Sequence, residues 1–135
     1  MTSEYLVDTN ACIRFLNGRS ESLRRQMLRQ NPSDIFLCSV VKAELLVGAA
    51  KSEHPDKRLA KLTPFFQRFV SLPFDDRAAE TYADIRADLE KRGLPIGPND
   101  LMIASIAVTN GLVLVTHNVR EFGRVNGLII EDWES

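Results

Sequence analysis

Near the N-terminus the sequence reads Glu4-Tyr5-Leu6-Val7-Asp8-Thr9-Asn10. Its first four residues predict a short strand, and the polar residues that follow predict the start of a helix. The same alternation recurs along the chain, with further strands expected at residues 35–38, 70–74, 112–115 and 128–130. Apolar strands that are separated by helices are typical of a parallel sheet covered on both faces. The sequence therefore predicts an α/β fold of three layers, with a central parallel sheet of about five strands and helices on both faces.

Length and composition indicate an ordinary globular chain. The 135 residues fit one domain, 1–135, and are 44% hydrophobic and 26% charged. The net charge of -1 provides no overall basic field for binding nucleic acids. No apolar run approaches the roughly 20 residues that span a bilayer, and the first residues do not resemble a secretory signal. The two cysteines, Cys12 and Cys38, match no zinc or redox spacing. We therefore expect a cytoplasmic protein whose cysteines are buried as small apolar residues.

Several residues predict where individual helices begin or bend. Ser39 is expected to cap the helix that follows the second strand, and Pro64 is expected to kink or split the next, Phe-rich helix. Asp75 or Asp76 should begin a long amphipathic helix. Pro98 suits the first turn of the last long helix, which is apolar almost all round and is therefore expected to be central.

Three acidic residues occupy positions that suggest chemistry. Asp8 follows the first strand, at the sheet edge where ligands bind in such folds; it could instead only cap a helix, although Thr9 or Asn10 could fill that role. Glu44 lies within an apolar helix, where it either reaches solvent or faces a polar cavity. Asp100 lies in the first turn of the most hydrophobic helix, where the helix dipole favours its charge. Because that helix end has no exposed face, the Asp100 carboxylate is expected to need a cation.

Thr116-His117-Asn118 places further polar groups after the strand at residues 112–115. Asn118 is either a fourth member of the site or a turn residue, and His117 is expected to be an exposed loop residue. Thr9, Asn10 and Thr116 are candidate accessory residues. A set of oxygen ligands suits Mg²⁺, with Mn²⁺ as a substitute, better than zinc. Such an ion can orient a water molecule and stabilise charge on a phosphodiester under in-line attack.

Four short motifs extend in order from residue 6 to residue 122. They are Leu6–Asn10 (LVDTN), Lys42–Leu45 (KAEL) with Gly48, Ile96–Ala104 (IGPNDLMIA), and Leu114–Asn118 (LVTHN) with Phe122. Together they resemble the motifs of PIN-domain ribonucleases, specifically the toxin C members of VapBC-type toxin–antitoxin pairs. The resemblance implies a PIN-like domain and a Mg²⁺-dependent endoribonuclease. It also implies that Asp8, Glu44 and Asp100 are acidic metal ligands. The fourth ligand position of the family is often Asp; here Asn118 occupies it and brings an oxygen without a charge.

The resemblance also implies partners. Family members are usually dimers, bind a small antitoxin in or near the acidic groove, and cut transfer RNA or ribosomal RNA. We therefore expect an RNA substrate, with tRNA favoured, a homodimer, a heteromeric complex with an antitoxin, and no membrane association. Phe65, Phe66 and Phe69, with the helix of Leu45 and Leu46, are a candidate apolar groove for the antitoxin or the dimer mate. The alternative is that these side chains fill the core.

Two other functions remain open from the residues alone. An aspartyl-nucleophile phosphohydrolase would also carry Asp8 after its first strand, although Asn10 stands where that chemistry requires a second acid. A catalytically inert PIN-like module would only bind RNA or a partner, yet it would retain a cluster of mutually repelling acids. A nuclease assay with and without a chelator, on tRNA and on a phosphate monoester, distinguishes the three.

Overall fold

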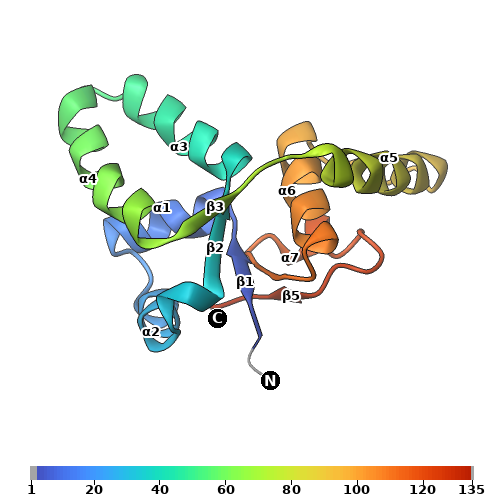
Figure 1. The fold of residues 1–135 in the computed structure, drawn as a ribbon, viewed down its shortest axis with the longest axis horizontal. Helices are drawn as coiled ribbons and strands as arrows, with labels where there is room; N and C mark the ends of the chain where they lie inside the picture. Colours follow the sequence, from blue (N-terminus) through green and yellow to red (C-terminus); the bar gives the residue numbers. More distant parts are fainter. Residues whose placement is uncertain (1–2, 135) are drawn as a thin grey trace.

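The computed structural model describes residues 3–134, and a five-stranded sheet lies at its centre (Figure 1). The strands are β1 (Tyr5–Val7), β2 (Ile35–Cys38), β3 (Val70–Leu72), β4 (Val113–Val115) and β5 (Ile130–Glu131). They lie in the order β3-β2-β1-β4-β5, and every neighbouring pair is parallel. In this register Leu6 of β1 faces Phe36 on one side and Leu114 on the other. The predicted parallel sheet of about five strands is confirmed.

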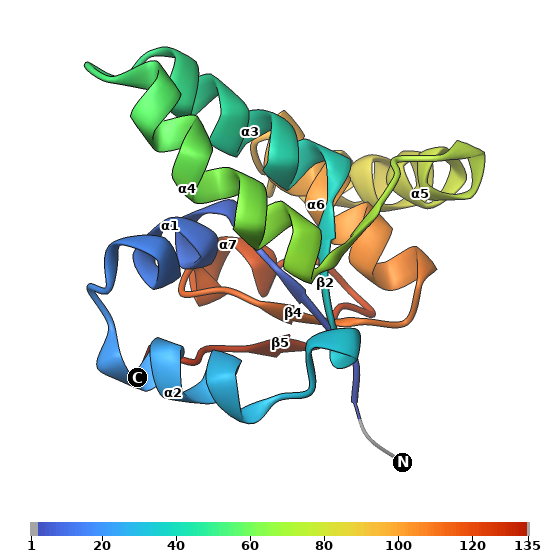
Figure 2. The same ribbon diagram turned by 60° about the vertical axis from the view of Figure 1, so that its left-hand side comes forward.

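Helices cover both faces of the sheet (Figures 1 and 2). On one side are α1 (Thr9–Asn17), α2 (Glu21–Arg29), α3 (Ser39–Ala50) and α4 (Pro55–Arg68); on the other are α5 (Asp76–Lys91), α6 (Pro98–Thr109) and α7 (Val119–Phe122). A short 3-10 helix, Pro32–Asp34, leads into β2. Right-handed crossovers explain the division, because the chain moves one way through the sheet from β1 to β3 and then returns to β4. Among residues 3–134, no helix combines the length and apolarity needed to cross a bilayer.

The direction of the chain through the sheet changes between β1 and β4. From β1 the chain continues to β2 and β3, whereas β4, on the other side of β1, continues to β5. At such a switch point the loops after the two strands diverge, and ligands bind at the carboxyl ends of the strands. Asp8 directly follows β1, and Thr116 directly follows β4. The fold therefore places these two residues side by side at the edge where a site is expected.

Helix α6 is a central element of the core, as its composition predicts. Six of its twelve residues are buried: Leu101, Ile103, Ala104, Ser105, Ile106 and Ala107. Burial of one large aliphatic side chain stabilises a fold by about 1.5–3 kcal/mol, so α6 is held firmly between α5 and the sheet. Its first turn, which begins at Pro98, carries Asp100. Cys12 and Cys38 are buried free thiols, which confirms their predicted place.

The predicted cap of α3 is wrong. Ser39 is the first residue of α3, and the capping position belongs to Cys38. The Ser39 hydroxyl donates instead to the Leu72 carbonyl of β3, at 3.4 Å. The Ser39 side chain thus bonds to a strand of the sheet, although its residue type predicts a bond to the start of the helix. At α5 the prediction is confirmed, because the Asp75 carboxylate accepts the Ala78 N–H at 2.9 Å.

Pro64 does not split α4, which runs without interruption from Pro55 to Arg68. The side chains that flank the proline are buried and hold the helix against the core, with Leu62 7% and Phe65 5% exposed. The rings of Phe65 and Phe69 pack edge to face, with centroids 5.3 Å apart. Phe69 is also 5% exposed. The two rings therefore fill the core, and the predicted groove is not built from them.

Candidate active site

Asp8 begins α1 at the carboxyl end of β1. Its Oδ1 accepts the Ala11 backbone N–H at 2.9 Å, so Asp8 itself caps the helix. The expectation that Thr9 or Asn10 could fill this role is wrong, because the chain enters the helix one residue earlier. The other oxygen of Asp8 accepts a hydrogen bond from the Thr116 hydroxyl at 2.6 Å. The first turn of α1 therefore fixes one oxygen of this carboxylate, and the residue after β4 fixes the other.

The surroundings of Asp8 favour its protonated form in the metal-free protein. Asp8 is 5% exposed, and this burial is the main cause that raises its pKa. The negative charges of Glu134 and Glu44 act in the same direction, while the hydrogen bonds from Thr116 and Ala11 act against it. A cation near these carboxylates would remove the cost of keeping them ionised.

Glu44 lies on α3 and faces polar partners from two other helices. Its Oε1 accepts the Thr9 hydroxyl of α1 at 2.5 Å, and its Oε2 accepts the Asn99 amide of α6 at 3.2 Å. Glu44 thus combines the two placements open from the sequence, because its carboxylate meets polar groups of two helices and is still partly exposed to solvent. Thr9 thus contacts an acid of the predicted site. Asn99 does so as well, and nothing in the sequence singled it out, although it directly precedes Asp100.

Asp100 lies in the first turn of α6 and is partly buried. Burial is the main cause that raises its pKa to about 6, and the charges of Glu121, Asp8 and Glu44 add to the effect. A hydrogen bond with Glu121 favours the protonated form as well. Asp100 is therefore the acid whose pKa is raised by the charges of all three other acids.

Glu121 of α7 is the residue that sequence reasoning missed. Its Oε1 accepts the Gly97 backbone N–H at 3.1 Å, just before the start of α6. The signal was present in the fourth motif, because Glu121 lies three residues after Asn118 and directly before Phe122. That spacing is the one at which a capping residue meets an acid in the first turn of a helix.

Asn118 caps α7 and supports Glu121. Its Oδ1 accepts the Glu121 N–H at 3.4 Å, and its amide donates to the Glu121 Oε2 at 3.2 Å. Its own backbone N–H donates to the Thr116 hydroxyl at 3.0 Å. The side-chain atoms of Asn118 are thus engaged with Glu121, and its role as a metal ligand stays a prediction.

The four carboxylates of Asp8, Glu44, Asp100 and Glu121 come from four separate elements and offer only oxygen ligands. Within residues 3–134, no three of them bring their oxygens within 4.8 Å of one another, as expected for like charges that repel one another in the absence of a cation. Mg²⁺ usually keeps several water molecules and needs only one or two direct carboxylates. The donor set therefore fits a hydrated divalent cation.

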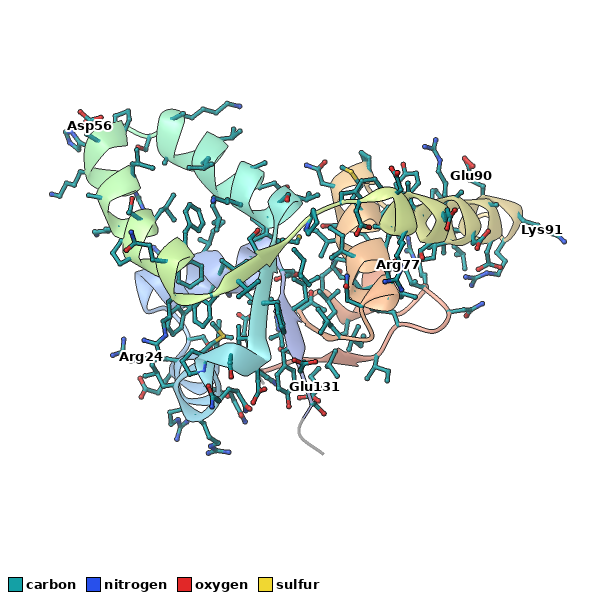
Figure 3. The ribbon with its side chains drawn as sticks, in the orientation of Figure 1. Arg24, Asp56, Arg77, Glu90, Lys91 and Glu131 are labelled. Atoms are coloured by element: carbon teal, nitrogen blue, oxygen red, sulfur yellow. The ribbon has the colours of Figure 1, made fainter. Side chains whose placement is uncertain are left out.

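A cavity of about 480 Å³ opens beside Asp8, on the α1 side of the cluster. Its walls include Asn10, Arg14, Arg19, His117 and Asn118. Many other charged side chains project from the periphery, as Arg24 of α2, Asp56 of α4 and Lys91 of α5 do in Figure 3. The cavity thus combines a nearly enclosed acid with two cationic side chains, an arrangement that can hold a metal and a polyanion together.

Comparison with known proteins places this chain in a family. The PIN domain family matches residues 5–128. The chain is 41% identical to the tRNA(fMet)-specific endonuclease VapC of Salmonella typhimurium over 130 residues, which cover 96% of this chain and 98% of the relative. It is 37% identical to Ribonuclease VapC2 of Rickettsia felis, with the same two coverages. The crystal structure of DNA-bound VapBC from Salmonella typhimurium superposes with a TM-score of 0.92 at 40% identity, covering 98% of this chain and 99% of that chain. The chain therefore belongs to the PIN-domain family, and within it to the VapC ribonucleases.

Proposed function

We propose that this chain is a divalent-metal-dependent endoribonuclease that acts as the toxin of a type II toxin–antitoxin pair and inhibits translation. The observation that carries the proposal is the gathering of Asp8, Glu44, Asp100 and Glu121 at the switch point of the sheet. PIN-domain ribonucleases generally depend on a divalent metal, and the two relatives named above are called endonuclease and ribonuclease. A cytoplasmic setting and a single catalytic domain over residues 1–135 belong to the same proposal.

Mg²⁺ is the proposed ion, with Mn²⁺ as a substitute, and Asp8, Glu44 and Asp100 are its proposed ligands. When bound, it would orient a water molecule and stabilise the charge on the phosphodiester. The protein contributes fixed carboxylates: Thr116 holds Asp8, and Thr9 holds Glu44. Asp100, whose pKa is raised to about 6 in the metal-free protein, would hold the cation in its deprotonated form.

Transfer RNA is the proposed substrate. The Salmonella typhimurium relative carries the name of a tRNA(fMet)-specific endonuclease. Arg19 lines the cavity beside Asp8 and offers a charge for RNA phosphates, while Arg14 on the same wall is paired with Glu134. An RNA loop can present unstacked bases to such a site, which is how proteins usually read RNA sequence.

The proposed partner is a small antitoxin that docks beside the site. A groove of about 290 Å³ between α1, α3 and α4 is lined by apolar side chains that include Ile13, Leu16 and Leu62, with Arg58 and Lys61 at its edge. Glu44 lies on its wall, so a segment seated there would reach the acid cluster. Similar solved structures are VapBC complexes. A homodimer is part of the proposal, and the exposed Leu46 and Val47 of α3 offer apolar surface for it.

Ile13→Asp is expected to weaken the antitoxin complex about tenfold or more. Ile13 is 44% exposed, so the substitution spares the core, and loss of one buried aliphatic contact costs about 1.5–3 kcal/mol. The binding partner for the measurement is the antitoxin that we expect a short open reading frame directly upstream of the gene to encode, and the readout is its dissociation constant. Ile129→Asp is the matched control, because Ile129 is 66% exposed and lies outside the groove. Equal affinities of the two variants would contradict this docking site.

Substitutions of Asn118 are expected to separate a site residue from a turn residue. Asn118→Asp adds a charge among the acids, so it should tighten Mg²⁺ binding and lower the Mg²⁺ concentration for half-maximal cleavage. It should also lower the free energy of unfolding of the metal-free protein, because the added carboxylate repels Glu121. Asn118→Ala should cost about 1 kcal/mol through the lost cap and reduce cleavage less than a substitution of Asp100. An unchanged Mg²⁺ requirement in Asn118→Asp would remove Asn118 from the site.

A cleavage assay tests the proposed function. Bulk tRNA is incubated with the protein and Mg²⁺, with and without a chelator, and the ends of the products are sequenced. We expect discrete cuts that the chelator abolishes. Hydrolysis of a phosphate monoester instead of RNA would favour the aspartyl-nucleophile phosphohydrolase, and RNA binding without cleavage would favour an inert module.

A further inference from the structure

A second group of metal-type ligands lies on the wall of the cavity, outside the acid cluster. It consists of His117, Asp132 and Glu134. His117 lies in the loop after β4, and the two acids lie just after β5. One ligand atom from each of the three lies within 4.8 Å of the other two, and among the described residues 3–134 no other three such side chains meet this closely. Because β4 and β5 are parallel neighbours, their carboxyl ends bring the histidine and the two acids to one edge.

Contacts within the protein fix one oxygen of each carboxylate. The Oδ1 of Asp132 accepts the Glu134 N–H at 2.9 Å, and the Oε1 of Glu134 accepts the Arg14 guanidinium. The Oδ2 of Asp132 lies 3.0 Å from the Nδ1 of His117. This geometry leaves the Oε2 of Glu134 as the remaining oxygen of the group.

The side chain of Glu134 provides a separate indication that this group of residues binds a cation. Its side chain is 5% exposed, and its Oε2 is buried without any hydrogen-bond partner. A buried polar atom without a partner destabilises the fold, and more so when it carries charge. Arg14 neutralises one of the two acids, so the group keeps a net negative charge when His117 is neutral.

Trp133 anchors the segment between the two acids. Its ring packs edge to face against Tyr5 of β1, with centroids 4.9 Å apart, and its Nε1 donates to Glu131 at 2.9 Å. Trp133 is 5% exposed. The two acids are thus carried by a rigid part of the fold, as a ligand set requires.

We propose that His117, Asp132 and Glu134 form a binding site for a transition-metal ion of the Zn²⁺ class. One imidazole nitrogen and two carboxylate oxygens are ligands that zinc accepts, and a three-residue set leaves a position for water. The imidazole distinguishes this site from the oxygen-only cluster, which suits Mg²⁺. The bound ion links the segment after β5 to the loop after β4, on the cavity wall that Asp8 also lines. The proposal does not depend on the ribonuclease activity.

Calorimetric titration with Zn²⁺, in the presence of about 10 mM Mg²⁺ to occupy the acid cluster, tests the proposal. We expect one Zn²⁺ per chain, with an affinity that falls roughly 10- to 100-fold in His117→Ala and in Glu134→Gln, the loss typical of a damaged metal site. His117 is 59% exposed, so its removal spares the core. His54→Ala is the matched control, because His54 is the other histidine of the chain and is exposed. Asp100→Asn should bind Zn²⁺ as the wild type does, which separates this site from the acid cluster.

The tryptophan supplies a second readout, since Trp133 is the single tryptophan and lies between two of the ligands. Co²⁺ should quench its fluorescence, and excess Zn²⁺ should restore it, in the wild type and in His54→Ala but not in His117→Ala. Identical Zn²⁺ isotherms for His117→Ala, Glu134→Gln and His54→Ala would overturn the proposal, as would the absence of Zn²⁺ binding by the wild type. The three side chains would then only hold the segment after β5 in place through ion pairs.

Discussion

Asp100→Asn is expected to lower tRNA cleavage by a factor of roughly 10² to 10⁴, which corresponds to the several kcal/mol that a catalytic metal supplies. The reason is the place of Asp100 in the cluster, where Glu121, Asp8 and Glu44 all act on its pKa. Asparagine keeps the shape and an oxygen, but it removes the charge that holds the cation. The same substitution relieves repulsion among the acids, so the metal-free variant should unfold at an equal or higher denaturant concentration.

Asp84→Asn is the matched control for this prediction. Asp84 is an exposed acid on α5, outside the cluster, and its variant should cleave tRNA at the wild-type rate. Circular dichroism of both variants establishes that they are folded. Cleavage by Asp100→Asn at a rate near that of the wild type would remove Asp100 from the catalytic site.

The Mg²⁺ concentration for half-maximal cleavage is expected to rise about tenfold between pH 7 and pH 5. The pKa of Asp100 is raised to about 6 in the metal-free protein, so this carboxylate is mostly ionised at pH 7 and mostly protonated at pH 5. A proton and a cation compete for it, and a carboxylate must be deprotonated to bind metal. Cleavage rates measured against Mg²⁺ concentration at pH 5, 6 and 7 give the shift directly. A constant Mg²⁺ requirement across this range would show that Asp100 does not titrate at the metal site.

The same pKa fixes the sign of a stability effect. The folded protein holds a proton on Asp100 up to about pH 6, whereas an unfolded chain releases it near the ordinary aspartate pKa of 3.8. Between these values the folded state binds more protons, so the free energy of unfolding contributed by Asp100 falls as the pH rises from about 4 to about 6. In urea titrations with a chelator, Asp100→Asn should lack this contribution. The stability of the variant relative to the wild type should therefore increase from pH 4 to pH 7.

The sequence predicts the framework of this protein well because short apolar strands and turn residues act locally. The stretch Ile35-Phe36-Leu37-Cys38 is predicted and observed as a strand with the same ends. Predictions failed where tertiary contacts override local preference. Ser39 satisfies a carbonyl of β3 and does not cap α3, and Pro64 does not split α4.

Part of the candidate site could also be predicted, because three of its acids stand in short local motifs. Asp8, Glu44 and Asp100 stand in recognisable motifs, and the structure brings them near one another at the predicted edge of the sheet. Glu121 and Asn99 enter the site only through contacts between distant parts of the chain, such as the Gly97 N–H that Glu121 accepts. The spacing of Asn118 and Glu121 indicates a helix cap, but it does not encode these long-range contacts, which form when Gly97 meets α7 and Asn99 of α6 meets α3.

Calorimetric titration of the metal-free protein with Mg²⁺ at pH 7 measures directly whether the acid cluster holds a divalent ion. The wild type and Asp84→Asn should bind about one Mg²⁺ with the same weak affinity. Asp100→Asn should bind at least about tenfold more weakly, because it lacks a charged ligand. If the isotherm of Asp100→Asn coincided with those of the other two proteins, the Asp100 carboxylate would not be a ligand of the Mg²⁺ ion.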